Sequence, residues 1–230
     1  MSKKRKWKNC FQVYKSALNK LIISFVILGL FYSSCAQENP RSSQLDLEPV
    51  VVNNKNEHKA YFASGCFWCV EAIYESLIGV NEVISGYSGG DTNNPTYVLV
   101  NTKLTGHAET IEVTYNPNEI TFSNLIDVYF GSQDIDQING QGPDSGPQYR
   151  SIIFYQNNIQ KELISTKIKE VESKTGLKVA AEVYPFRKFW IAENYHQNFK
   201  KNNPNHPYIK NVSDPRFKNF KFKFEDLIKD

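Results

Sequence analysis

Two periods of apolar spacing alternate along the chain from about residue 58 onward. Short apolar runs with strand spacing predict five strands, at residues 59–63, 80–87, 109–115, 151–155 and 179–183. Apolar positions three and four residues apart predict helices at residues 66–77, around 122–129 and around 164–171. Beyond residue 184 the chain is aromatic and irregular, which indicates a segment wrapping a formed core, with a short terminal strand or helix at 217–228. Because strands and helices alternate, we expect a mixed α/β or α+β domain.

The first forty residues follow a different pattern. Residues 1–34 carry seven Lys or Arg and no acid, with an apolar run at 21–32. A run of this length is too short to span a bilayer comfortably, so it predicts a secretory signal. Residues 32–35, Tyr-Ser-Ser-Cys, resemble the bacterial lipoprotein signal, which is cleaved just before a cysteine that receives lipid, although Tyr32 replaces the usual Leu. The expectation is an exported protein of the cell envelope, anchored by lipid at Cys35; the alternative is an uncleaved amphiphilic anchor.

A polar linker joins this signal to the folded part. Residues 37–57 are rich in Asn, Ser, Pro and charges and show no sustained period, which predicts a tether. The expected organisation is therefore a signal at 1–34, a tether at 35–57 and a folded domain at 58–230. Without the signal, the chain carries 20 basic and 24 acidic residues, a balance that excludes the basic footprint of a nucleic-acid-binding protein.

The cysteines indicate redox chemistry. Cys10 lies in the signal and Cys35 is the expected lipid site, so Cys66 and Cys69 remain, spaced C-x-x-C. A disulfide between them would close too small a loop to be a useful structural staple. Two buried apolar thiols, or half of a zinc site, are the alternatives. The histidines, however, show no metal-like pairing: His58, His107, His196 and His206.

The predicted helix beginning at Cys66 favours this residue as the nucleophile. Unpaired N–H groups and the positive end of the helix dipole stabilise a thiolate at a helix N-terminus. Cys69 lies one turn later on the same face, within reach of a sulfenic acid at Cys66. Thioredoxin-like exchangers also use C-x-x-C, but there Trp precedes the first Cys and Gly-Pro fills the gap, whereas Phe67 and Trp68 fill it here.

Residues 65–71, Gly-Cys-Phe-Trp-Cys-Val-Glu, resemble the signature of A-type peptide methionine sulfoxide reductases. Six further motifs of that family follow in order: Gly-Tyr-Ser-Gly-Gly at 86–90, Asn-Pro-Thr-Tyr at 94–97, Gly-His-Ala-Glu at 106–109, Gln-Gly-Pro-Asp-Ser-Gly-Pro-Gln-Tyr-Arg-Ser at 141–151, Ala-Glu-Asn-Tyr-His-Gln at 192–197 and Asn-Pro at 203–204. Each motif is weak alone, but seven in order are specific, and they cover roughly residues 61–208.

The resemblance implies an α+β fold with a central mixed sheet and a ferredoxin-like core. It implies reduction of the S epimer of methionine sulfoxide, free or within proteins, by a monomer without a bound cofactor. In the implied cycle Cys66 attacks the sulfoxide and becomes a sulfenic acid, and Cys69 condenses with it. An external thioredoxin-like dithiol then reduces the disulfide. Outside the cytosol such an enzyme needs a membrane electron shuttle or a secreted thioredoxin-like partner.

The matched motifs also supply groups that this chemistry needs. Attack at sulfur requires a proton for the sulfoxide oxygen, and Glu109, by resemblance the acid, holds one near neutral pH only if burial raises its pKa. Tyr97 and Tyr149 can donate hydrogen bonds to that oxygen, and Asp144 is expected to act through an ordered water or by holding a Tyr. The remaining expectations are an apolar methyl pocket from Phe67 and Trp68, and supporting roles for His107 and His196.

The chain departs from the family in two places. Gln133-Asp134-Ile135 stands where many relatives have His-Asp-Pro, and Ile209 follows Pro207-Tyr208 where relatives often have a Cys. No cysteine follows Cys69, so no other resolving thiol is available in the domain. Two other functions stay open at this stage: an exported thiol-disulfide oxidoreductase, which would reduce insulin, and a non-catalytic binding module that kept the fold.

Overall fold

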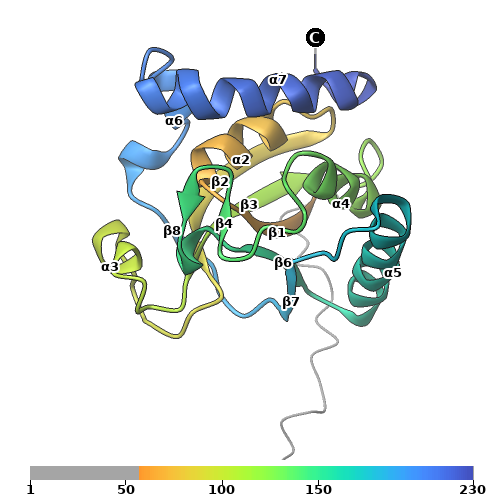
Figure 1. Ribbon diagram of the computed structural model, residues 1–230, viewed down its shortest axis with the longest axis horizontal. Coiled ribbons are helices and arrows are strands. Elements are labelled where there is room, and N and C mark those ends of the chain that lie inside the picture. Colours follow the sequence, from red (N-terminus) through yellow and green to blue (C-terminus); the bar gives the residue numbers. More distant parts are fainter. Residues whose placement is uncertain (1–56, 230) are drawn as a thin grey trace, which may run out of the picture. The chain divides into compact units, whose positions relative to one another are not determined.

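The computed structural model describes residues 57–229 and contains a central six-stranded sheet (Figure 1). Its strand order is β7-β6-β1-β3-β2-β8. The pairs are antiparallel except β6 with β7, which are parallel, so the sheet is mixed and the expected α+β class is confirmed. The strands are β1 (His58–Ser64), β2 (Val80–Ser88), β3 (Ala108–Tyr115), β6 (Ser151–Tyr155), β7 (Glu182–Pro185) and β8 (Trp190–Ile191).

Strand β3 lies at the centre of this sheet, between β1 and β2. All eight of its residues are buried, because neighbouring strands flank it and other elements cover both faces. Its side chains therefore include carboxylates held away from water. Glu112 is paired with Lys59 and Tyr61 on β1, whereas Glu109, three residues earlier, lies near the start of α2.

The helices lie against this sheet and its edges. The principal helices are α2 (Phe67–Glu75), α4 (Phe122–Gly131), α5 (Asn158–Thr175) and α7 (Asp214–Lys223); α3 (Tyr97–Asn101) and α6 (Phe199–Asn202) are shorter. Helix α2 buries Val70, Ile73 and Tyr74 in the core, and α7 crosses over it, as Figure 1 shows. None of the helices within residues 57–229 is long and apolar enough to cross a bilayer.

Short elements complete the chain between these helices and strands. A small hairpin pairs β4 (Gly140–Gln141) with β5 (Asp144–Ser145). One-turn helical segments are η1 (Pro147–Tyr149), η2 (Asn194–His196), η3 (Ile209–Ser213) and η4 (Glu225–Leu227). These segments carry most of the candidate site residues that do not lie on α2 or β3.

Most predicted elements appear within a few residues of their expected bounds, including the last predicted strand, which is displaced toward the C-terminus. The strand expected at 179–183 begins at Glu182, where the parallel register pairs Glu182 with Ile152. The C-terminal stretch is more regular than expected, because it contains β8, α6 and a helix α7 that begins at Asp214. The predicted signal, the lipid site at Cys35 and nearly all of the tether lie outside the described residues.

Candidate active site

Cys66 caps the N-terminus of α2, directly after the turn that follows β1. Gly65 in this turn has φ +81°, and a Cβ there would lie 2.5 Å from the Cβ of Gln141. Only glycine fits such a left-handed, closely approached position. The turn therefore connects the end of β1 directly to the start of α2 and places Cys66 at the N-terminus of this helix, as the sequence predicts.

Arg216 of α7 fixes this turn from the far end of the chain. Its guanidinium donates to the Ser64 carbonyl at 3.0 Å, to Ser64 Oγ at 2.8 Å and to the Ser132 carbonyl at 2.8 Å. These bonds tie the residue two positions before Cys66 to the end of α4. Arg216 was not predicted as a site residue from the sequence, because it lies outside the matched family motifs.

Glu109 lies next to the start of α2 and is only 2% exposed. Its carboxylate accepts the Phe67 N–H at 3.0 Å. Burial raises the pKa of Glu109 to about 8, even though this hydrogen bond and its N–H dipole favour the charged form. The carboxyl is therefore mostly protonated at neutral pH, as the expected role as a proton donor requires.

Tyr97 and Tyr149 reach the same site from two separate segments, α3 and η1. Both hydroxyls lie close enough to Cys66 and Glu109 for these groups to raise the pKa of each phenol, although burial is the main cause. Because the pKa values rise, both phenols keep their protons and can donate hydrogen bonds. The structure thus brings together four of the predicted groups: a thiol, a carboxylic acid and two phenols.

Phe67 and Trp68, from which the sequence predicts a methyl pocket, form an aromatic wall with His196 and Phe199. Phe67 is buried and its ring lies 4.9 Å from the His196 ring. Trp68 stacks on Phe199 with ring centroids 3.6 Å apart, and its indole N–H donates to His196 Nδ1 at 3.1 Å. This hydrogen bond holds the indole plane, so His196 has the supporting role predicted for it.

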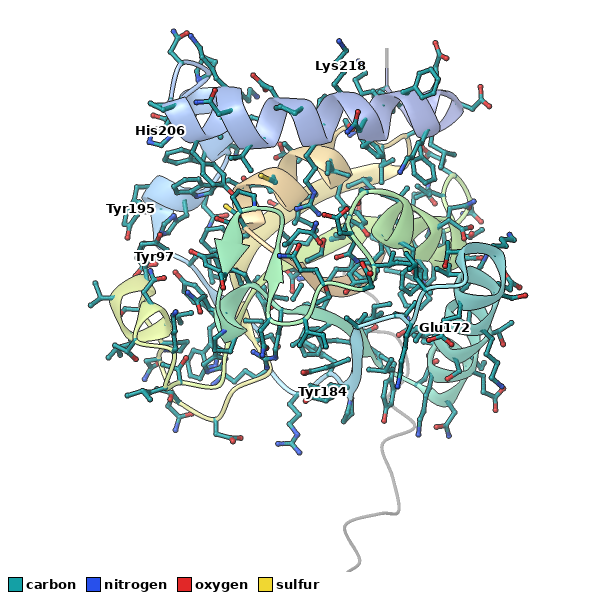
Figure 2. All side chains as sticks on the ribbon, in the orientation of Figure 1. Tyr97, Glu172, Tyr184, Tyr195, His206 and Lys218 are labelled. Carbon is teal, nitrogen blue, oxygen red and sulfur yellow. The ribbon has the colours of Figure 1, made fainter. Side chains whose placement is uncertain are left out.

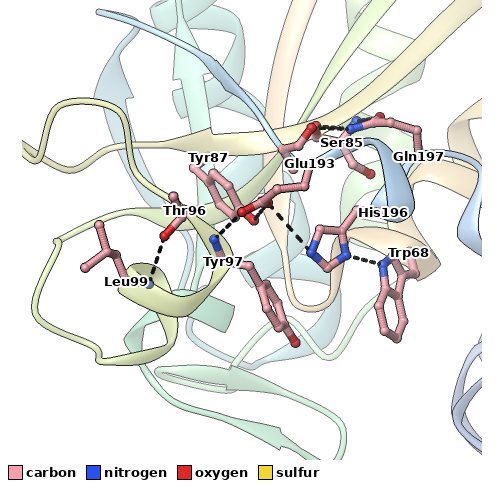
Figure 3. Close-up of polar contacts among 10 residues, drawn as sticks. Trp68, Ser85, Tyr87, Thr96, Tyr97, Leu99, Glu193, His196 and Gln197 are labelled. Carbon is pink, nitrogen blue, oxygen red and sulfur yellow. Dashed lines mark hydrogen bonds and ion pairs between the residues drawn. The ribbon is translucent and has the colours of Figure 1, made fainter.

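A carboxylate that the sequence reasoning missed, Glu193, links this wall to Tyr97 (Figure 3). It accepts the Tyr97 backbone N–H at 2.8 Å and the Tyr87 hydroxyl at 2.9 Å, and it lies 3.9 Å from His196 Nε2. Burial lowers the pKa of His196, so its ring is neutral and can accept from Trp68. Glu193 stands within the matched motif at 192–197, which was the available signal.

His107 supports a neighbouring loop and does not reach the thiols. Its Nδ1 accepts the Gly90 N–H at 3.2 Å, and its Nε2 lies 2.8 Å from the Thr92 carbonyl. The ring therefore carries its proton on Nε2 and bridges the loop at both ends. This loop leads into Tyr97, so the supporting role predicted for His107 agrees with the structure.

Asp144 holds a tyrosine, which is one of the two roles expected for it. The tyrosine is Tyr208, whose hydroxyl donates to the Asp144 carboxylate. The same hydroxyl lies 3.9 Å from Cys69 Sγ. The sequence gives no sign that Tyr208 of the Pro207-Tyr208 dipeptide reaches Cys69, because 139 positions separate the two residues.

The two thiols are free and buried, and their ionisation differs from the expectation. Burial raises the pKa of Cys66, and the neighbouring Cys69 adds to this effect. A hydrogen bond with Cys66 and the charge of Arg216 lower the pKa of Cys69 to about 6, against the effect of burial. The helix terminus therefore does not make Cys66 the resting thiolate, because desolvation outweighs the dipole and the Phe67 N–H is used by Glu109.

Gln133, which stands where many relatives of the family have His, has a hydrogen-bond partner. Its side-chain oxygen accepts from Ser151 Oγ at 2.9 Å and so ties the loop after α4 to β6.

Within the part of the chain that the structure describes, no group of three or more His, Cys, Asp or Glu side chains is arranged to hold a metal ion.

Comparisons with known proteins identify the family of the chain. Residues 58–227 match the family described as "Peptide methionine sulfoxide reductase". The MsrA enzyme of Sulfolobus acidocaldarius is 45% identical over 167 residues, covering 73% of this chain and 95% of that protein. That of Pasteurella multocida is 42% identical over 171 residues, covering 74% and 98%.

Solved structures show the same fold. The reduced form of Mxr1 from Saccharomyces cerevisiae has a TM-score of 0.61 and 32% identity, covering 67% of this chain and 90% of that one. Methionine sulfoxide reductase A of Corynebacterium diphtheriae has a TM-score of 0.59 and 27% identity, covering 70% and 83%. The chain therefore belongs to the peptide methionine sulfoxide reductase family and is a thiol-dependent oxidoreductase that reduces methionine sulfoxide.

Proposed function

We propose that Cys66 is the nucleophile and Glu109 the proton donor in the reduction of the S epimer of methionine sulfoxide, free or in proteins. The observation that carries this proposal is the buried Glu109, whose pKa of about 8 keeps a proton beside Cys66 and two phenols. A solvated carboxyl would have lost that proton at neutral pH. No bound cofactor takes part in the proposed cycle.

In the first step the Cys66 sulfur attacks the sulfoxide sulfur while the oxygen gains a proton from Glu109. The oxygen is transferred to Cys66, which becomes a sulfenic acid, and methionine leaves with two more electrons on its sulfur. Because the Cys66 thiol has a raised pKa, its own proton must also leave during this step. Glu109 becomes a carboxylate when it donates its proton, and this carboxylate is the base that accepts the Cys66 proton.

The substrate is oriented by groups of opposite character. The hydroxyls of Tyr97 and Tyr149 donate to the sulfoxide oxygen, and the faces of Phe67 and Trp68 receive the S-methyl group. A chiral sulfur with its oxygen and methyl group fixed in this way is accepted in one configuration only. The family resemblance assigns that configuration as S.

In the second step Cys69 attacks the sulfenic sulfur of Cys66 and a disulfide forms, while the departing hydroxide takes the proton now held by Glu109 and leaves as water. Cys69 suits this role because its pKa of about 6 supplies a thiolate at neutral pH. The Tyr208 hydroxyl, which donates its proton to Asp144, lies 3.9 Å from this sulfur and accepts from the Cys69 thiol while that thiol is protonated. A thioredoxin-like dithiol then reduces the disulfide and returns the enzyme to its starting state.

Replacing Cys69 with serine tests this second step. The variant should still form one methionine per enzyme and then stop at a sulfenic acid, detectable by dimedone labelling at Cys66. Steady-state turnover with a thioredoxin-type reductant should fall at least about tenfold. Dithiothreitol should retain part of the turnover, because a small thiol can reach the sulfenic acid directly.

The opposite result would remove Cys69 from the cycle. If Cys69→Ser turns over with thioredoxin as fast as the parent, the external reductant itself attacks the sulfenic acid. Ser76→Ala, at the half-buried C-cap of the same helix, is a suitable control for general effects of altering α2.

We also propose that residues 1–34 direct export and that Cys35 carries the lipid that holds a monomeric enzyme at the bacterial cell envelope. The support is the basic and apolar pattern of residues 1–32 and the Ser-Ser-Cys that follows. The polar tether would let the domain reach substrates at a distance from the membrane.

Cys35→Ala tests the anchor. The parent should partition with membranes and its mature N-terminus should have the mass of a diacylated Cys35. The variant should either retain its signal or release the domain into the soluble fraction. An unmodified N-terminus well beyond residue 35 in the parent would contradict this proposal.

A further inference from the structure

Glu71 is a buried carboxyl group that has no part in the proposed cycle. It is the last residue of the motif at 65–71 and is only 1% exposed. Burial raises the pKa of Glu71 to about 7, and the charge of Glu75 adds to this rise. Because an ionised carboxylate is costly to bury, it is kept in such a place where its oxygens are used as hydrogen-bond acceptors.

The donors to Glu71 come from the start of α6, 127 positions later in the chain. The Asn198 N–H donates to Glu71 Oε1 at 3.1 Å, and the Phe199 N–H lies near enough to favour the charged form of the carboxyl. Asn198 has φ +54° and ψ +31°, which is a left-handed backbone for a residue other than glycine. Such a backbone persists where its surroundings fix it, and Glu71 fixes it from α2.

Gln197 fixes the same turn to the sheet (Figure 3). Its side chain accepts the Ser85 N–H at 2.9 Å and donates to the Ser85 carbonyl at 2.9 Å and to the Ala192 carbonyl at 3.1 Å. These bonds anchor the residue immediately before Asn198 to β2. The turn between η2 and α6 is therefore held from two sides, by Gln197 to the sheet and by Glu71 to α2.

Phe199 follows this turn and stacks on Trp68. The two rings are nearly parallel, with an interplanar angle of 7° and centroids 3.6 Å apart. His206 lies edge-on to both rings, on the side of the molecule where Figure 2 also labels Tyr97 and Tyr195. Phe199 therefore covers one face of an indole that borders the candidate active site.

The ring stack and the Glu71 hydrogen bond belong to one junction between α2 and α6. Trp68 and Glu71 stand three residues apart and therefore lie on the same side of α2. Their partners, Phe199 and Asn198, are adjacent in the chain. A shift of Asn198 away from Glu71 would therefore move the ring that supports Trp68.

We propose that Glu71 is a positioning residue whose carboxylate fixes Phe199 behind Trp68, so that the pocket for the S-methyl group stays too narrow for a larger S-alkyl group. This inference rests on the proposed function, which assigns the face of Trp68 to the methyl group. With Phe199 fixed, the indole cannot tilt back to admit a larger group. One extra methylene in an apolar pocket changes specificity roughly 10- to 200-fold.

Glu71→Met tests this role, because methionine keeps the length of the side chain but has no carboxylate oxygen. Reduced full-chain enzyme is mixed with the S epimer of methionine sulfoxide or of its S-ethyl homologue, ethionine sulfoxide. The ratio of the two single-turnover rate constants gives the preference for the methyl substrate. In Glu71→Met this preference should fall about fivefold or more. A general loss of structure would slow both substrates alike and leave the ratio unchanged.

Three further variants locate the effect. Glu71→Gln keeps one acceptor oxygen, so it should lose a smaller part of the preference. Glu75→Met, the same substitution one turn later at a half-buried position of α2, is the matched control and should keep the parent ratio. Phe199→Leu removes the stacked ring and should itself lower the preference. Glu71→Met should add little in that background, because both changes act on the same wall.

The inference is overturned if a folded Glu71→Met keeps the parent preference. If that variant does not fold, an unchanged preference in Glu71→Gln overturns it. Fully additive losses in the double variant with Phe199→Leu would show that Glu71 does not act through Phe199, and would overturn it as well. A parent enzyme without any preference for methyl over ethyl contradicts instead the methyl pocket of the proposed function, and this inference falls with it.

Discussion

Replacing Cys66 with serine should abolish the reduction of methionine sulfoxide. The alcohol of serine has a far higher pKa than a thiol and is a poor nucleophile toward sulfur, and it cannot take up the oxygen as a sulfenic acid. Methionine formed from a sulfoxide peptide in the presence of dithiothreitol should fall to the rate without enzyme. Dimedone should label no sulfenic acid at residue 66.

Two controls separate lost chemistry from lost structure. Cys69→Ser removes a thiol three residues away but should still form one methionine per enzyme. The melting temperature of Cys66→Ser should stay close to that of the parent, because serine has nearly the same shape and can keep contact with Cys69. Appreciable turnover in a folded Cys66→Ser enzyme would contradict the assignment of the nucleophile.

The elements around Cys66 were predictable because their patterns are local. The strand ending at Ser64 and the helix beginning at Phe67 follow from alternating and helical apolar spacing. Gly65 between them marks the turn. The position of Cys66 at a helix start therefore needed no knowledge of the rest of the fold.

The ionisation of the thiols was not predictable in this way. The helix dipole is a property of the local sequence, but the burial of Cys66 and the charge near Cys69 come from distant segments. Arg216, which lowers the pKa of Cys69, lies on a helix at the opposite end of the chain. Desolvation by such packing outweighed the local effect, and the sequence pattern contains no measure of it.

The positioning residues were missed for a related reason. Glu193 binds Tyr97 across 96 positions, and Tyr208 reaches Cys69 across 139. Each stands in or beside a family motif, so the sequence indicated that the segment matters. Which side chain of the motif reaches the site depends on how the irregular segment after β8 folds back over α2.

Glu109 shows both what a sequence pattern can predict and what it cannot. Its position on a strand followed from the apolar pattern of residues 109–115. The complete burial of β3 did not, because the strand carries Glu109, Thr110 and Glu112 among its apolar residues and looks half exposed. The sheet order, with β1 and β2 on either side, and the start of α2 against this face together show why this carboxyl lacks water.

Glu109→Gln should lose roughly two to four orders of magnitude in the rate of sulfoxide reduction, the usual range for a positioned proton donor. Glutamine keeps the oxygen that accepts the Phe67 N–H, so the start of α2 should be undisturbed. It cannot deliver a proton. Glu112→Gln, on the same strand but paired with Lys59 and Tyr61, is the matched control and should keep the parent rate.

The parent rate should fall as the pH rises through about 8, because Glu109 then loses the proton that it donates. The low residual rate of Glu109→Gln should lack this fall. If the variant loses less than about threefold, or if both enzymes show the same alkaline limb, Glu109 is not the donor.

The same substitution should stabilise the protein, with a definite dependence on pH. The pKa of Glu109 rises from 4.5 to about 8 on folding, so the folded state binds its proton more tightly than the unfolded state. That contribution to stability is complete below pH 4.5 and is lost as the pH rises through about 8. Glutamine does not titrate, so the unfolding free energy of the variant relative to the parent should grow by on the order of 3 kcal/mol between about pH 4 and about pH 7. Denaturant unfolding at several pH values measures this difference, and a difference that stays constant would mean that the carboxyl is not held protonated by the fold.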